Sequence, residues 1–293
     1  MPVRVVTDST SDIPPRMAGE LDIIIVPLNV HFGNQVYRDG VDLSAEEFYR
    51  RLAAGSILPT TSQPSAGVFT EVYRRLLDSG CEIVSIHISA KLSGTMNSAA
   101  AARESLGANS TIIILDSLQA SMGLGLIVLA AARAAQEGAT LDGVAATARD
   151  AISRANTVVM VDTLEYLHKG GRIGKAQAFL GGLLKVKPII RVHDGEAYPL
   201  ERPRTRARAL ERLLRWVGGL SPTALAVMHS TTSDEAASFA QGLDRFFPRE
   251  RIHIGRFGPV MGTYLGPGAL GVTVLEGQAQ HGTAAKDTEA RTS

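Results

Sequence analysis

Short apolar runs alternate with longer amphipathic stretches through the first half of the chain. Runs rich in β-branched residues occupy residues 3–7, 23–28, 83–88 and 112–115. Apolar residues at helical spacing follow at residues 45–54, 66–79, 96–106 and 122–137. This alternation is typical of a parallel sheet covered by helices. The pattern predicts an N-terminal α/β domain of the Rossmann-like kind over residues 1–155.

The pattern changes near residue 155. Residues 187–192 and 196–199 read as a hairpin, because an Asp-Gly turn at residues 194–195 separates them. Further strands are predicted at residues 157–161, 224–229, 252–257 and 270–275, and helices at residues 205–217 and 234–246. These elements predict a smaller α+β domain over residues 156–278 with a mixed or antiparallel sheet. Residues 279–293 contain no large apolar side chain, so we expect a disordered tail.

Composition narrows the function classes. The formal net charge of the 293 residues is +1, which argues against nucleic-acid binding, as does the lack of a recognisable helix-turn-helix. The longest uncharged apolar stretch, residues 122–132, is too short to span a membrane, and residues 1–10 lack a signal core. A single cysteine, Cys81, fits a buried thiol in a reducing compartment. We therefore expect a cytoplasmic protein with no transmembrane segment.

Two hydroxyl-rich loops precede helices in the first half. One contains Thr61 and Ser62 before the helix at 66–79, and the other contains Ser93 and Gly94 after the strand at 83–88. Hydroxyls and free amides at a helix start can bind an anion, and open α/β sheets bind ligands at the carboxyl ends of their strands. Either loop alone is compatible with ordinary helix capping. Together they predict a ligand site.

Residues 162–174 read as a short helix that ends at a double glycine. The spacing of Asp162 and Glu165 predicts an N-terminal cap, and Gly170 suits a left-handed stop. Arg172 follows, either as a structural clamp across the domain junction or as a positive charge for an anion. A last glycine loop, residues 262–268, lacks the spacings of nucleotide-binding loops.

Asp8 and Asp12 follow the first strand, where they either cap the turn or form an acid/base or metal pair. The second interpretation would make the protein a small-molecule phosphotransferase or hydrolase that uses the hydroxyl loops. Such chemistry needs a histidine, a lysine or a metal beside the two carboxylates, and their spacing in the sequence does not supply one. The seven histidines lack the spacing of a metal site, one cysteine makes a zinc site improbable, and no nucleophile elbow is present. We expect no catalytic residue, metal or cofactor.

A basic helix is predicted in the second half. Arg208, Arg212 and Arg215 share one face of the helix at 205–217, opposite its leucines. A solvated face explains this pattern, and docking of an acidic protein partner is the sharper hypothesis. RNA binding is third, because no aromatic residues are interleaved.

The combined segments resemble the DegV family of bacterial fatty-acid-binding proteins. They are TDSTSDI, TTSQPS, LSGT, DTLEYLHKGGRIG, KPII and GPGALG, spread from residue 7 to residue 271. The resemblance implies an N-terminal parallel-sheet domain packed on a smaller α+β domain, with a long acyl chain buried between or within them. It also implies that hydroxyl loops hold the carboxylate, here Thr61 with Ser62 beside it and Ser93 with Gly94, and that Arg172 joins this polar network.

One position departs from that family. A histidine is usual in the loop at residues 262–268, and this sequence has Tyr264 there. A phenol donates a hydrogen bond but carries no positive charge near neutral pH. The departure predicts head-group binding that is weaker, less dependent on pH, or tuned to another ligand.

The resemblance further implies that the protein is a carrier without catalytic activity. Some members present the bound acid to a separate fatty acid kinase, which phosphorylates it into a phospholipid precursor. We hypothesise that the face formed by Arg208, Arg212 and Arg215 docks such a kinase.

Overall fold

The N-terminal sheet is parallel, as the sequence predicts. The computed structural model describes residues 1–55, 57–107, 110–180 and 186–277, so the predicted tail at 279–293 lies outside the described residues. Strand order is β2-β1-β6-β7. The strands are β1 (Val3–Asp8), β2 (Ile24–Val26), β6 (Glu82–His87) and β7 (Ile112–Asp116). The predicted strand at 23–28 is therefore only three residues long.

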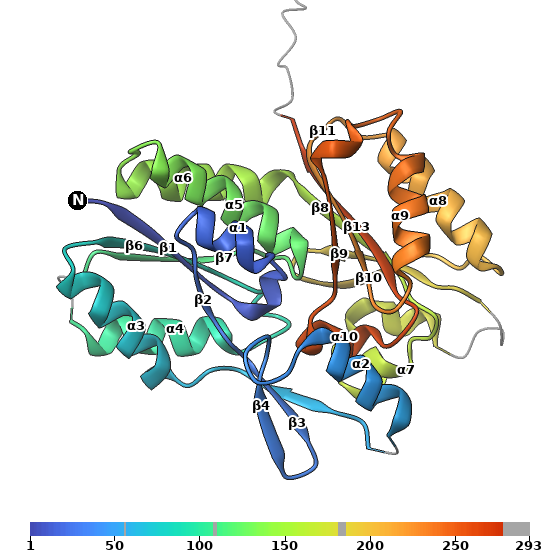
Figure 1. Cartoon of the computed structure of the whole chain (residues 1–293), viewed down its shortest axis with the longest axis horizontal. Coiled ribbons are helices and arrows are strands. Elements are labelled where there is room, and N and C mark those ends of the chain that lie inside the picture. Colours follow the sequence, from blue (N-terminus) through green and yellow to red (C-terminus); the bar gives the residue numbers. More distant parts are fainter. Residues whose placement is uncertain (56, 108–109, 181–185, 278–293) are drawn as a thin grey trace, which may run out of the picture.

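Helices cover both faces of this sheet (Figure 1). Side chains alternate along β1, so Val6 packs with α3 and α4 while Val5 packs with α5 and α6. These helices are α3 (Ala66–Asp78), α4 (Thr95–Ser105), α5 (Met122–Gln136) and α6 (Leu141–Arg154). Helix α6 was not predicted from the sequence. A short turn, η1 (Ser9–Ser11), and α1 (Pro15–Glu20) connect β1 to β2.

The second sheet has the order β10-β9-β8-β13-β11-β12. Its strands are β8 (Ala155–Met160), β9 (Ile189–His193), β10 (Glu196–Glu201), β11 (Pro222–His229), β12 (Ile252–Arg256) and β13 (Leu270–Glu276). Only β11 and β12 pair in parallel, which makes the sheet mixed. One face is covered by α8 (Arg206–Gly218) and α9 (Ser233–Gly242), and η3 (Arg249–Arg251) precedes β12. The predicted helix at 234–246 thus ends four residues early.

Helix α5 lies between the two sheets. It contacts β1 and β6 of the first sheet and β8, β11 and β13 of the second. Ten of its residues are buried, including Leu124, Ile127 and Val128. A helix that is apolar on all sides is one that packs on all sides. This placement explains the uncharged stretch at 122–132. None of the helices in the described ranges is long and apolar enough to cross a membrane.

A third sheet was not predicted. It is antiparallel, with the order β4-β3-β5, and comprises β3 (Asn29–Phe32), β4 (Gln35–Arg38) and β5 (Thr60–Ser62). The strands are short and β4 is largely exposed, so no apolar run marks them. Against this sheet lie α2 (Ala45–Ala54) and α10 (Pro259–Leu265). Thr61, which the sequence placed in a loop, therefore lies on a strand.

Three local predictions in the second half were wrong. The first part of the predicted glycine loop at 262–268 belongs to α10, where Gly262 allows close packing, and only residues 266–268 form a turn, with positive φ at Gly266 and Gly268. In α7 (Glu165–Lys169), Thr163 caps the Glu165 amide, because Asp162 instead pairs with Lys187 and Arg206. Gly171, not Gly170, has the left-handed backbone, with φ of 71°. The turn η2 (Gly174–Phe179) follows.

Helix α10, near the C-terminal end of the described chain, packs against residues from its N-terminal part. Val260 belongs to a core cluster with Leu28, Val30 and Phe48 from the first 62 residues. A Cβ atom at Gly262 would lie 2.5 Å from a ring carbon of Phe48 and 2.7 Å from the Tyr49 hydroxyl. Only glycine permits this approach. The division at residue 155 stays a prediction, because this cluster crosses it.

We predict that Gly262→Ala lowers the free energy of unfolding by about 1–3 kcal/mol, because the added methyl group overpacks the contact between α10 and α2. Urea denaturation measures this change. The matched control is Gly19→Ala in α1, where a Cβ atom would meet nothing within 4 Å. There the higher helix propensity of alanine should stabilise the protein by up to about 1 kcal/mol. Equal effects of the two substitutions would contradict the packing role of Gly262.

Candidate functional site

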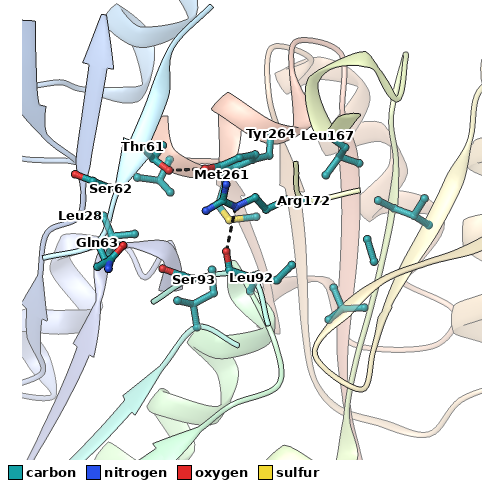
Figure 2. A pocket seen from close by; sticks show the side chains of 16 residues that line it. Leu28, Thr61, Ser62, Gln63, Leu92, Ser93, Leu167, Arg172, Met261 and Tyr264 are labelled. Atoms are coloured by element: carbon teal, nitrogen blue, oxygen red, sulfur yellow. Dashed lines mark hydrogen bonds between the residues drawn. The ribbon is translucent and has the colours of Figure 1, made fainter. Parts of the chain in front are cut away.

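A cavity lies where all three sheets approach one another (Figure 2). It encloses about 710 Å³ not filled by protein atoms, part of it open to solvent. Its walls are mainly apolar and include Ile88, Leu92, Leu167, Ile190, Val192 and Met261. Hydroxyl groups and Arg172 gather at one end. The hairpin β9–β10 forms one wall and is held by Ser89, whose hydroxyl donates to the Gly195 carbonyl oxygen at 2.6 Å.

The first hydroxyl loop reaches this cavity through β5. The hydroxyls of Thr61 and Tyr264 are hydrogen-bonded at 2.5 Å, which connects β5 to α10. Ser62 also lines the cavity, and its hydroxyl lies 2.9 Å from Nε2 of His31 on β3. His31 was not predicted as a site residue, because only the pairing of β3 with β5 brings it next to Ser62.

The second hydroxyl loop enters the cavity from the end of β6. Ser93 lines it, and its hydroxyl accepts a hydrogen bond from the Thr95 amide at 3.3 Å. Gly94 is the residue before α4 and is not among the lining residues. A Cβ atom at Gly94 would lie 2.7 Å from the amide nitrogen of Gln63, so glycine leaves room for that side chain. Gln63 itself lines the cavity, although its position in the sequence did not mark it as a site residue.

Arg172 combines the two roles that the sequence left open. Its guanidinium donates to the Leu92 carbonyl oxygen at 3.2 Å and to that of Gly170 at 2.9 Å, so it clamps two backbone segments. It also lies 5.3 Å from the centre of the Tyr264 ring and lines the cavity. Among the described residues, no carboxylate forms an ion pair with it. Its positive charge therefore remains available to an anion.

The cavity accordingly suits an amphiphile with one anionic end. Among the described lining residues, only Arg172 is charged, and the neighbouring groups are the hydroxyls of Thr61, Ser62, Ser93 and Tyr264. Burial of hydrocarbon against the apolar walls provides affinity, and the polar end provides orientation.

The Asp8 carboxylate does not reach this cavity. It is fully buried, accepts hydrogen bonds from the Ile88 amide and Thr10, and lies 3.0 Å from Nδ1 of His87. Tyr73 and Ser85 extend this chain of contacts through the core. All of the carboxylate's neighbours are internal, so it ties β1 to β6. Ser85, His87 and Asp8 are connected in the order of a Ser-His-Asp triad, but all three side chains are fully buried and the Ser85 hydroxyl has no path to a substrate. Within the part of the chain that the structure describes, no cluster of three metal-ligating side chains was found.

The three arginines of the predicted docking face are exposed on α8. Arg212 lies 3.3 Å from Glu201, and Arg215 pairs with Glu211 at 2.8 Å. None of the three lines the cavity, and α8 lies on the outer face of the second sheet (Figure 1).

The chain is similar to known proteins over nearly its whole length. The family model for DegV proteins, described as uncharacterised, matches residues 2–277. A DegV domain-containing protein of Halalkalibacterium halodurans is 38% identical over 276 residues, which cover 92% of this chain and 97% of that protein. Protein DegV of Bacillus subtilis is 37% identical over 278 residues, with 93% and 98% covered.

Solved structures agree. A DegV family protein from Thermus thermophilus, described by its fatty acid binding, has a TM-score of 0.88 and 35% identity, with 94% of this chain and 100% of that chain covered. Bacillus subtilis DegV, a fatty acid binding protein, has a TM-score of 0.85 with the same identity and coverage. A stearic acid-binding protein from Eubacterium ventriosum has a TM-score of 0.83 and 26% identity, with 94% and 98% covered. The chain thus belongs to the DegV family, as its sequence motifs indicate.

Proposed function

We propose that this protein binds a long-chain fatty acid in the cavity described above. The observation that carries the proposal is that Arg172, the one charged side chain among the described lining residues, lies at the hydroxyl-lined end of an apolar cavity. Each methylene group buried contributes about 0.8 kcal/mol, so the chain supplies most of the affinity. The fatty acids bound by the structural relatives support this assignment.

The carboxylate is proposed to lie among Thr61, Ser93 and Tyr264. The hydroxyls of Thr61 and Tyr264 already share one hydrogen bond, so one of them can turn toward a carboxylate oxygen. Tyr264 supplies a donor without a charge near neutral pH, which leaves Arg172 as the countercharge. Ser62 and Gly94 act beside these residues, Ser62 with its own hydroxyl and Gly94 by admitting Gln63.

The head group is proposed to be presented to a separate enzyme. Thr61, Arg172 and Tyr264 also border a neighbouring cavity that contains Lys169, so the polar end of the acyl site adjoins a second opening. A kinase could reach the carboxylate there and phosphorylate it. We propose that the protein itself performs no catalysis. The cytoplasmic location expected from the sequence stays a prediction.

Protein purified under native conditions is expected to retain a long-chain acid, because a buried acyl chain dissociates slowly. Native mass spectrometry measures the added mass, and extraction followed by gas chromatography identifies the acid. Delipidated protein should then bind a fluorescent acyl probe such as cis-parinaric acid. The proposal fails if the protein is empty and neither the probe nor added fatty acids bind.

Loss of head-group hydroxyls should weaken acyl binding. Thr61→Val and Ser93→Ala each remove one donor, which costs about 0.5–1.5 kcal/mol, so the Kd for cis-parinaric acid should rise about twofold to tenfold. Thr147→Val is the matched control, because this hydroxyl donates to Gly143 in α6, away from the cavity. Unchanged affinity in both head-group variants would contradict the assignment.

If α8 docks a kinase, changes on its basic face should affect phosphorylation of the bound acid but not acyl binding. Replacing Arg208, Arg212 and Arg215 together by Glu should slow phosphorylation of the bound acid by a bacterial fatty acid kinase and leave probe binding unchanged. Trapping the acyl phosphate with hydroxylamine measures the rate. The control replaces the exposed Arg16, Arg50 and Arg103 by Glu, which changes the net charge equally at other places. Equal slowing in both triple variants, or joint loss of binding, would refute a specific docking face.

A further inference from the structure

Two carboxyl groups lie at the start of α10, Asp39 buried and Asp12 half-buried. Asp12 accepts a hydrogen bond from the Gly258 amide at 3.0 Å and another from the Ser121 hydroxyl at 2.5 Å. Asp39 is 4% exposed, and its polar neighbours are the Val260 amide and the Ser9 hydroxyl. Gly258 and Val260 flank the first residue of α10. Asp12 therefore bonds directly to the backbone at the start of α10, and Asp39 is buried beside that backbone.

The carboxyl groups of Asp12 and Asp39 both lie close to Gly258. A Cβ atom at Gly258 would lie 2.8 Å from Oδ1 of Asp12 and 3.5 Å from Oδ1 of Asp39. In the described parts of the chain, no lysine or arginine forms an ion pair with either group. Burial, together with the charges of Asp39 and Asp8 and against the hydrogen bonds from Ser121 and Gly258, raises the pKa of Asp12 to about 8. Burial also raises the pKa of Asp39 to about 7. The pair therefore loses its protons across mildly alkaline pH.

The other ionisable groups around the pair come from several elements. Within the described residues they are Asp8 on β1, Tyr49 on α2 and Arg256 on β12, with His87 behind Asp8 and His229 behind Arg256. Burial raises the pKa of Tyr49 and lowers that of His229, so both stay neutral between pH 7 and 9.

Helix α10 connects this pair to the acyl site. Val260 and Met261 line the acyl cavity, and Tyr264 bonds to Thr61. On its other side, the pair faces a second cavity of about 1330 Å³ that is partly open to solvent. Water can therefore exchange protons with the carboxyl groups while the protein stays folded.

We propose that Asp12 and Asp39 are positioning residues of the acyl site. With a proton on the pair, they hold α10, and Tyr264 with it, against Thr61. When both carboxyl groups are ionised, their negative charges repel each other beside Gly258. Each charge is then stabilised by separation from the other and by hydration. Movement of the start of α10 toward the second cavity relieves both costs and weakens the contact with Thr61. This inference rests on the proposed acyl binding.

Binding and protonation are then coupled in both directions. Acyl binding favours the held position of α10, so it favours the protonated pair, and binding takes up protons. If binding raises the pKa of one carboxyl group by about one unit, the affinity falls about tenfold as the pair ionises. A purely structural role of these residues would change affinity at all pH values alike.

The test measures cis-parinaric acid binding by calorimetry from pH 6.5 to 9, in two buffers of different ionisation enthalpy. The wild-type protein should take up protons near pH 7.5 and lose about tenfold in affinity by pH 9. Asp12→Asn and Asp39→Asn should each flatten both responses. Asp42→Asn is the matched control, because it removes an exposed carboxylate paired with Arg38, and it should keep the wild-type profile.

Ser121→Ala gives a second test that keeps every charge. The Ser121 hydrogen bond lowers the pKa of Asp12, so its loss should move the midpoint of the affinity profile to higher pH. This variant decides the matter if Asp12→Asn fails to fold. Tight binding with the wild-type pH slope in the Asp variants, or an unmoved midpoint in Ser121→Ala, would overturn this inference alone. No binding at any pH would overturn the proposed function and this inference with it.

Discussion

Ten of the fifteen residues of α5 are buried, because the helix lies between the two larger sheets. The helix packs on the parallel sheet through β1 and β6 and on the mixed sheet through β8, β11 and β13. Its residues Leu124, Ile127 and Val128 share one core with Val84 from the first sheet. Separating the two halves would expose this helix to water, at a large hydrophobic cost. The two sheets are therefore held at a fixed distance, and the cavity between them keeps its walls.

Helix α10 brings together the properties that matter for binding. It contributes Met261 and Tyr264 to the cavity, packs on α2 through Gly262, and begins between the carboxyl groups of Asp12 and Asp39. A helix of seven residues has little stability of its own, so its position comes from these contacts. These contacts and the bond between Tyr264 and Thr61 therefore lie within a single short helix. This short helix links the chemistry of distant segments to the head-group end of the cavity.

Local patterns identified several candidate residues but not their arrangement. Thr61 and Ser93 stood out because hydroxyls precede helices, and both line the cavity. Gly94 was predicted with them, but it does not line the cavity. It instead leaves room for the side chain of Gln63, which does. His31 gave no signal, since a lone histidine between apolar residues is common in half-buried strands. Asp39 gave none either, because an aspartate near a glycine reads as a turn.

The amino-acid sequence was enough to predict the alternation of strands and helices, a second sheet that is mixed or antiparallel, and membership of the DegV family from its motifs. These depend on side-chain periodicity and on short-range capping, which neighbouring residues specify. Only the tertiary structure decided that β5 is a strand, that Tyr264 meets Thr61 across 203 positions, and that Asp12 faces Gly258 across 246. Such contacts carry no local pattern, because each partner is polar or small and gains its role only when burial removes water and leaves the other as its neighbour.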